Sequence, residues 1–281
     1  MIKRSVLIFI LLFFCSAWLD ADPIKADKQK IVSIAPSTTE ILFALGLDEE
    51  IVGVSTFCNY PSRAQEKEKV GTFSQPNTEK ILSLQPDIVF CTGLEQAPVI
   101  GKLRQLGLNV YVSDPSSIEE MFDSIMEMAA IVGRSKAAAE LIDRMKKDIE
   151  TVTSKTILIP EKDKVKVFIE FWKDPLMTAG KGSFIDELIA LAGGVNISSD
   201  VNRPYSYFSP EEVIKRDPDC IILAYMVNKD AAKMVGRRLG WEGIAAVKNS
   251  RIYNDINPDI LLRPSPRLGV SISELYERLY P

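Results

Sequence analysis

The chain has 281 residues, a formal net charge of −4 and no histidine. The absence of imidazole excludes a Ser–His–Asp hydrolase, a histidine general base and a histidine-ligated zinc or haem site. No cluster of lysine and arginine stands out in the sequence, so we expect no nucleic-acid partner, because phosphate binding depends on clustered cations.

The chain opens with 21 residues that have the layout of a secretory signal peptide. Lys3 and Arg4 precede an uninterrupted apolar run at residues 6–14, and small residues follow it. This run is shorter than the roughly 20 apolar residues that cross a bilayer, so a cleaved signal is favoured over an uncleaved anchor. A lipid anchor on Cys15 is less favoured, because Phe14 occupies the position where lipoprotein processing takes a small residue.

After this signal, residues 22–134 alternate short β-branched runs with helical stretches, which predicts an α/β lobe with mainly parallel strands. Residues 37–40 and 117–120 both read Ser-x-x-Glu, the pattern of a capping box at the start of a helix. The predicted strands are residues 31–34, 51–54, 88–90 and 110–112, and the predicted helices are residues 37–45, 78–84, 97–106 and 117–132.

Residues 135–156 predict one long helix near the middle of the chain. The stretch lacks Gly and Pro, and Leu141, Met145 and Ile149 recur every four residues along one face. A helix of about 20 residues is about 30 Å long, so this one could join two lobes as a rigid backbone helix. An ordinary surface helix within one domain is the alternative.

Residues 157–281 resume the alternation and predict a second α/β lobe. Ser183 and Ser209 are predicted helix caps, and Pro210 suits the first turn of the helix that follows Ser209. The remaining predicted elements are strands at residues 165–171, 220–224 and 251–253 and a C-terminal helix at residues 265–279.

Three cysteines remain outside the signal, Cys58, Cys91 and Cys220. No CxxC spacing indicates a metal or redox site. Buried free thiols are favoured, because cysteine packs as a small hydrophobic residue. A disulfide between Cys58 and Cys91 is the alternative.

The two halves share an internal repeat. Residues 77–89 and 209–221 each carry a capped helix with Glu near its start, then an aliphatic pair, then Pro-Asp and an apolar strand. The Pro-Asp pair favours a turn between helix and strand. Because the copies flank the predicted long helix, the repeat favours two related lobes over one extended sheet.

Aromatic side chains gather in the loops that follow the predicted strands. Ligands of α/β proteins bind outside the carboxyl ends of strands and between domains, and aromatic rings offer stiff surfaces to a bulky ligand. We therefore expect an interlobe cleft lined by aromatic rings, although some of these rings could simply fix loops to the core. The seven candidates are Phe57, Tyr60, Phe73, Trp172, Tyr205, Tyr207 and Phe208.

The chain resembles the long-helix-linked class (class III) of periplasmic solute-binding proteins of ABC importers, and within it the cobalamin-binding members. The match covers essentially the whole chain after the signal. The segments that carry it are Ile31 to Glu40, Val52 to Ser55, Asn59-Tyr60-Pro61, Val70-Gly71, Pro76 to Ile81, Pro86 to Val89, Thr178 to Lys181, Gly193 to Asn196 and Arg263 to Arg267.

This resemblance implies two Rossmann-like lobes joined by one long backbone helix, a periplasmic monomer without a cofactor, and an ABC permease with its ATPase as partners. It implies Glu79 and Glu211 as the carboxylates that dock on the permease, one per lobe. The predicted ligand-binding residues are Phe57, Tyr60, Phe73, Trp172, Tyr205, Asp259 and Arg263, with Phe171 as the alternative to Trp172.

The ligand that the resemblance implies is cobalamin or a related corrinoid, which carries its own lower base and needs no histidine from the protein. This chain departs from the cobalamin-binding pattern, because Phe57 and Phe73 replace Tyr and Trp, and Tyr205 replaces another Trp. A ferric siderophore or haem is therefore the alternative ligand, with haem held by a tyrosine such as Tyr60 or Tyr205, or by stacking alone.

Two other classes of protein compete with a binding protein. An enzyme is disfavoured, because residues 178–183 resemble a phosphate-binding loop only weakly and Pro175 stands where its first glycine would be. A cell-surface sensor or adhesin on the same fold is the third class, and a neighbouring permease gene would argue against it.

Overall fold

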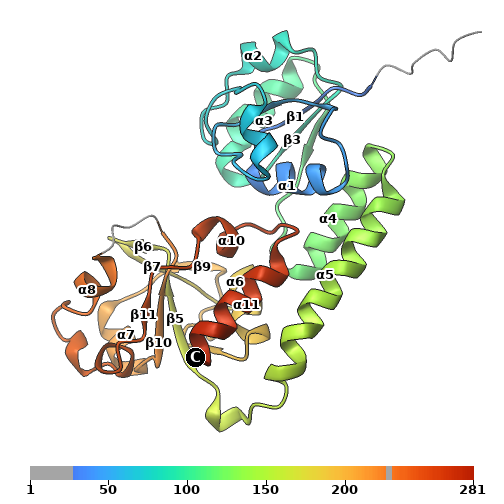
Figure 1. The fold of residues 1–281 in the computed structure, drawn as a ribbon. Helices are drawn as coiled ribbons and strands as arrows, with labels where there is room; N and C mark the ends of the chain where they lie inside the picture. Colours follow the sequence, from blue (N-terminus) through green and yellow to red (C-terminus); the bar gives the residue numbers. More distant parts are fainter. Residues whose placement is uncertain (1–27, 226–229) are drawn as a thin grey trace, which may run out of the picture.

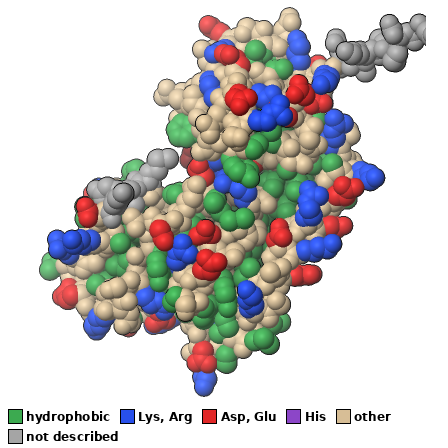
Figure 2. Space-filling view, viewed as in Figure 1, with side chains coloured by type: hydrophobic (Ala, Val, Ile, Leu, Met, Phe, Trp, Pro, Cys, Tyr) green, Lys and Arg blue, Asp and Glu red, His purple; other side chains and the backbone are tan. Residues whose placement is uncertain are grey.

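The computed structural model describes residues 28–225 and 230–281, which form two α/β lobes (Figure 1). The predicted signal peptide, with Cys15 as the less favoured lipidation site, lies outside the described residues. Within the described part, none of the helices has the length and hydropathy of a membrane span. Acidic and basic side chains are interspersed on the face shown in Figure 2.

The N-terminal lobe is built on a four-stranded parallel sheet with the order β2-β1-β3-β4. Its strands are β1 (Ile31–Ser33), β2 (Ile51–Val54), β3 (Ile88–Cys91) and β4 (Val110–Val112). The helices that connect them are α1 (Pro36–Ala44), α2 (Thr78–Ser83) and α3 (Ala97–Gln105). The strands and helices of this lobe match the predicted ones to within a residue or two.

The C-terminal lobe repeats the same sheet. Its parallel strands have the order β11-β10-β5-β8, which equals that of the first sheet when β5 is matched to β1. The strands are β5 (Lys166–Glu170), β8 (Val195–Asn196), β10 (Cys220–Leu223) and β11 (Ile252–Tyr253). The helices are α6 (Phe184–Leu191), α7 (Pro210–Arg216), α8 (Ala231–Val235), α9 (Ala245–Lys248), α10 (Pro258–Leu262) and α11 (Leu268–Leu279). The expectation of two α/β lobes with parallel sheets is confirmed.

The internal repeat has a hydrogen-bonding function in both lobes. Asp87 accepts a hydrogen bond at Oδ2 from the Lys30 amide (2.7 Å), just before β1, and Asp219 accepts the same bond from the Lys166 amide (2.9 Å), at the start of β5. The Asp87 and Asp219 amides in turn donate to the carbonyls of Lys30 and Lys166. Each Pro-Asp turn therefore fixes the register of the third strand of its lobe against the first.

The predicted long helix is confirmed as α5 (Ser135–Thr156). It forms a hairpin with α4 (Ile118–Ile131), and it packs against α6 and α11 of the C-terminal lobe. The lobes are thus connected by two helices, of which α5 runs along the C-terminal lobe (Figure 1).

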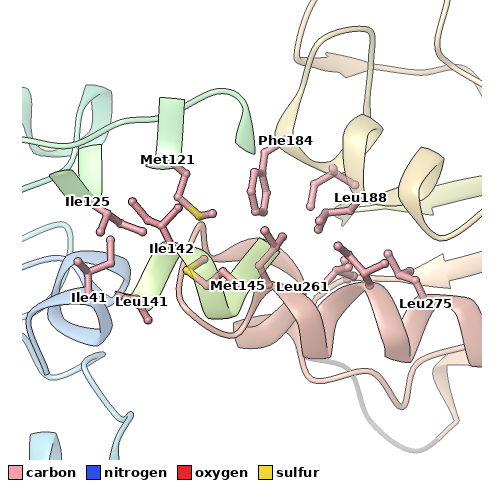
Figure 3. Close-up of a cluster of buried hydrophobic side chains, with 14 of the residues drawn as sticks. Ile41, Met121, Ile125, Leu141, Ile142, Met145, Phe184, Leu188, Leu261 and Leu275 are labelled. Atoms are coloured by element: carbon pink, nitrogen blue, oxygen red, sulfur yellow. The ribbon is translucent and has the colours of Figure 1, made fainter. Parts of the chain in front are cut away.

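One apolar core continues from lobe to lobe through this hairpin (Figure 3). Ile41 of α1 packs in the same cluster as Met121 of α4 and Met145 of α5, and the cluster extends to Leu188 of α6 and Leu275 of α11. All five side chains are at most 1% exposed. The two lobes therefore share a core, in addition to smaller clusters of their own.

The prediction of a capping box at residues 37–40 was wrong. Helix α1 starts at Pro36 with Ala35 as its N-cap and has no side-chain cap, and Thr39 donates to the Ala35 carbonyl. Glu40 is 3% exposed and accepts hydrogen bonds from two arginines instead. The predicted caps Ser117, Ser183 and Ser209 are confirmed, since each accepts a hydrogen bond from an amide in the first turn of its helix.

The C-terminal helix begins at Leu268 and not at residue 265. Pro264 and Pro266 keep the segment from Arg263 to Arg267 out of a helix, because the residue before a proline avoids the α region. The sequence pattern also missed an antiparallel sheet of three short strands, β6 (Trp172–Lys173), β7 (Leu176–Ala179) and β9 (Tyr205–Tyr207).

Candidate ligand-binding cleft

A pocket of about 440 Å³ lies between the two lobes. The N-terminal lobe contributes residues that follow each of its four strands: Ser37 after β1, Phe57 after β2, Thr92 after β3 and Asp114 after β4. The carboxyl ends of parallel strands meet at one edge of a sheet, so these loops converge. The complete lining of described residues is Pro36, Ser37, Phe57, Phe73, Ser74, Thr92, Glu95, Ser113, Asp114, Pro115, Tyr205, Leu262, Arg263 and Pro264.

Aromatic rings from both lobes form the apolar part of this pocket. Phe57 and Phe73 come from the N-terminal lobe, and Tyr205 comes from β9 of the C-terminal lobe. The Tyr205 ring packs edge-to-face against Phe171, with 5.5 Å between the centroids. Phe57 is 48% exposed and Tyr205 is 55% exposed, so both rings present open apolar surface to the space between the lobes.

A buried glutamine positions the loops on the N-terminal side of the pocket. The Gln96 side chain is 1% exposed, and its amide nitrogen donates to the carbonyls of Phe73 (2.8 Å) and Ile34 (3.0 Å). Its amide oxygen accepts a hydrogen bond from the Thr92 amide (2.9 Å). Gln96 therefore ties the loops after β1 and β3 to the loop that carries Phe73. Nothing in the sequence pattern marked this residue.

The polar part of the pocket is made of hydroxyl groups and carboxylates. Asp114 accepts a hydrogen bond from the Thr92 hydroxyl (3.2 Å), and Glu95 lies on the same wall. Partial burial raises the pKa of the Tyr205 phenol above its ordinary value, and the carboxylate of Asp114 raises it further. Tyr205 is thus a neutral phenol at physiological pH.

Arg263 brings a positive charge to the pocket, but acidic groups already balance it. Its guanidinium forms ion pairs with Glu40 (3.1 Å) and Asp259 (2.7 Å), and its side chain is 12% exposed. Among the described residues that line the pocket, Arg263 is the one cation. The two carboxylates of Glu95 and Asp114 outnumber this one guanidinium, so the pocket lining has an acidic excess.

The structure brings four of the seven predicted ligand-binding residues into the pocket lining, namely Phe57, Phe73, Tyr205 and Arg263. The other three, Tyr60, Trp172 and Asp259, lie outside it. The guanidinium of Arg267 lies over the ring of Tyr60, at 4.2 Å from its centroid, and Asp259 pairs with Arg263.

Three aromatic side chains of the C-terminal lobe do not line the pocket. Trp172 on β6 is 55% exposed, and its indole donates to the Asp174 carbonyl (3.0 Å). Tyr207 is exposed two residues beyond Tyr205 on β9, and Phe208 packs against Phe168 in the core of the lobe. Of the seven aromatic candidates, Phe57, Phe73 and Tyr205 line the pocket, whereas Phe208 fixes its loop to the core, which was the alternative for some of these rings.

The predicted docking carboxylates, Glu79 and Glu211, are both exposed and occupy the first turns of α2 and α7. These helices are the two copies of the internal repeat and lie on different lobes (Figure 1). The geometry therefore presents one carboxylate per lobe to the surroundings.

The three described cysteines are free and buried, so the disulfide between Cys58 and Cys91 is not formed. Burial raises the pKa of the Cys91 and Cys220 thiols to about 12. Burial also raises the pKa of Cys58, whose sulfur lies 3.2 Å from the Ser55 hydroxyl. In the described part of the chain, no group of three or more Cys, Asp and Glu side chains could hold a metal ion.

Residues 31–257 match the family model described as periplasmic binding protein. The chain belongs to this family. It is an exported, non-enzymatic substrate-binding protein of an ABC importer.

Several known proteins resemble the chain along most of its length. It is 36% identical over 263 residues to the uncharacterized ABC transporter substrate-binding lipoprotein YvrC of Bacillus subtilis, covering 92% of this chain and 82% of the relative. It is 32% identical to the vitamin B12-binding protein of Vibrio cholerae, covering 90% of this chain and 89% of that protein. A crystal structure of a possible iron-binding (periplasmic solute-binding) protein from Staphylococcus epidermidis has 31% identity and a TM-score of 0.80, covering 90% of this chain and 99% of that one.

Proposed function

We propose that this protein binds cobalamin or a related corrinoid in the interlobe pocket and delivers it to the permease of its ABC transporter. The observation that carries the proposal is the composition of the pocket: aromatic rings from opposite lobes, a wall of hydroxyl and carboxylate groups, and a cation already paired with acidic side chains. The vitamin B12-binding protein of Vibrio cholerae, at 32% identity, supports this ligand class.

The charge of the pocket favours a corrinoid over haem. Haem carries two propionates, and the one cation among the described lining residues, Arg263, is committed to Glu40 and Asp259. The carboxylates of Glu95 and Asp114 would repel a further negative charge. The periphery of a corrinoid carries neutral amides, which donate and accept hydrogen bonds with hydroxyl and carboxylate groups.

The tyrosine in the pocket has a different role for each ligand. Haem iron would need Tyr205 as an axial phenolate, which would have to lose its proton beside the carboxylate of Asp114. A corrinoid brings its own lower ligand to cobalt, so Tyr205 needs only to offer its ring face.

A ferric siderophore is the second candidate. The acidic excess of the pocket wall suits a neutral or cationic iron chelate as well as a corrinoid, and the protein from Staphylococcus epidermidis is described as possibly iron-binding. An anionic chelate would meet the same repulsion as haem.

Isothermal titration calorimetry with three ligands tests the proposal. Cyanocobalamin should bind with one site per chain, whereas haemin and an anionic ferric catecholate should give no saturable heat. Saturable binding of haemin without binding of cyanocobalamin would overturn the proposal, and binding of a neutral ferric hydroxamate alone would establish the second candidate.

We propose further that a cleaved signal peptide sends the protein to the periplasm and that Glu79 and Glu211 dock it on the permease. The Bacillus subtilis relative is named a lipoprotein, which supports the alternative of a lipid anchor on Cys15. The intact mass of the exported protein distinguishes the two, because lipidation leaves Cys15 as an acylated first residue.

A further inference from the structure

A buried carboxylate of the N-terminal lobe is held by two arginines of the C-terminal lobe. Arg267 donates to both oxygens of Glu40, from Nε to Oε2 (2.7 Å) and from Nη2 to Oε1 (2.6 Å). Arg263 donates from Nη1 to Oε1 of the same carboxylate (3.1 Å). The Glu40 side chain is 1% exposed, and the two arginines are 12% and 13% exposed.

A second set of contacts joins the same two segments. Asn59, in the loop after β2, accepts a hydrogen bond from Arg263 Nη1 (2.8 Å) and donates to Asp259 Oδ2 (2.7 Å). Arg263 Nη2 donates to the carbonyl of Phe57 (3.3 Å), and the Arg267 guanidinium stacks on Tyr60. Every one of these contacts crosses from the N-terminal lobe to the C-terminal lobe.

The network is balanced in charge. Two carboxylates, Glu40 and Asp259, face two guanidinium groups, Arg263 and Arg267. Burying such a set contributes little net stability, because desolvation offsets the ionic attraction, but removing one member leaves an uncompensated charge. The geometry that the set imposes is therefore a better reason for its presence than the stability it adds.

We infer that Glu40, Arg263 and Arg267 form an interlobe latch that sets the width of the cleft and the position of the pocket wall. The latch reaches the pocket through two residues, because Arg263 lines it and the Phe57 carbonyl is one of the acceptors. Glu40 and Arg267 are not pocket-lining residues. They are positioning residues, which act on the ligand through Arg263 and Phe57.

The inference rests on the proposed function only for its ligand readout, since the distance between the lobes can be measured without ligand. Spin labels on Gln105→Cys in α3 and Lys248→Cys in α9 report that distance, because both positions are exposed and the described native cysteines are buried. The test variants are Glu40→Gln and Arg267→Gln. The matched control is Arg278→Gln, which removes an arginine that pairs with Asp255 and Glu274 inside the C-terminal lobe.

In both test variants we expect a broader distribution of interlobe distances in the absence of ligand, while the control keeps the wild-type distribution. With cyanocobalamin, ligand dissociation should become about tenfold faster in the test variants and stay unchanged in the control. Arg267→Lys keeps the charge but loses the bidentate contact with Glu40. Its distance distribution and its ligand dissociation rate should lie between those of wild type and Arg267→Gln.

An unchanged distance distribution in folded Glu40→Gln would overturn the latch. Should a single substitution prevent folding, Glu40→Gln combined with Arg267→Gln removes both charges together, and a wild-type distribution in that protein overturns the inference equally. If wild-type protein binds no corrinoid, the proposed function fails, whereas the distance measurement still shows whether the latch sets the distance between the lobes.

Discussion

Tyr205 illustrates how single side chains make the proposed site. It is the aromatic ring that the C-terminal lobe contributes to the pocket lining, opposite Phe57 and Phe73. The aromatic content of the loops predicted a ring-lined cleft, but it did not show which of the rings enter the pocket. Tyr205 and Tyr207 point to the same face of β9, and the two differ because Tyr207 lies beyond the pocket.

This pair gives a direct test of ring stacking. Tyr205→Ala should weaken cyanocobalamin binding by about tenfold or more, because a stacked ring contributes on the order of 1 kcal/mol beyond its buried area. Tyr205→Phe should retain the affinity, since the ring is kept. Calorimetry checks both, with Tyr207→Ala as the control; equal losses in Tyr205→Ala and Tyr207→Ala would contradict a specific role for Tyr205.

The burial of two thiols predicts how the free energy of unfolding depends on pH. The pKa values of Cys91 and Cys220 are raised to about 12, so the folded state disfavours their thiolates. Their contribution to the free energy of unfolding is fully present below the unfolded pKa of about 8.5 and is lost as the pH rises towards 12. Urea unfolding should therefore show a decrease in stability above about pH 9.

Cys91→Ser combined with Cys220→Ser is the matching control, because it removes both thiols. That double variant should be less stable overall but should show a weaker decline in the alkaline range. A decline as steep as that of wild type would mean that other groups cause it.

At the scale of elements, the two repeat helices α2 and α7 present the predicted docking carboxylates. Glu79→Gln combined with Glu211→Gln should leave cyanocobalamin binding unchanged, because both side chains lie outside the pocket, but should reduce transport through the permease strongly. Ligand uptake into proteoliposomes that hold the transporter measures this. Glu119→Gln is the control, since Glu119 is also an exposed glutamate in the first turn of a helix. Equal transport by the double variant and the control would exclude these carboxylates from docking.

The elements also show what the sequence could predict. Alternating apolar runs and cap residues were enough to locate all four strands of the N-terminal parallel sheet, three of the four strands of the C-terminal one (β8 was missed) and α5, because period and capping are local properties. The Ser37 to Glu40 pattern failed because the helix starts earlier, at Pro36, so that Ser37 is not the N-cap, and the Glu40 carboxylate binds arginines of a distant segment instead. Strands β6 and β9 were missed because they are only two or three residues long and depend on pairing with β7.

The shared apolar core determines how far the two lobes can move relative to each other. Apolar side chains of α4 and α5 pack against α1 on one side and against α6 and α11 on the other (Figure 3). The sequence predicted the helix but not this arrangement, because periodicity shows which face is apolar and not what covers it. A continuous core of this kind favours small changes in lobe angle over wide opening.

Met145 in α5 tests this coupling. Met145→Ala should lower the free energy of unfolding by about 2–5 kcal/mol, because the side chain is 1% exposed within the shared core. Scanning calorimetry should show one transition that moves to lower temperature as a unit. Two separate transitions, with only one shifted, would show that the lobes unfold independently. Met126→Ala, at an exposed position of α4, serves as the control and should leave the transition in place.

The proposed ligand of the interlobe pocket is a corrinoid. Mass spectrometry of the small molecules released from the protein after purification from its own host identifies this ligand. We predict the mass and the cobalt isotope pattern of a corrinoid at a ratio close to one per chain. Release of haem or of an iron chelate at that ratio, with no corrinoid, would contradict the claim.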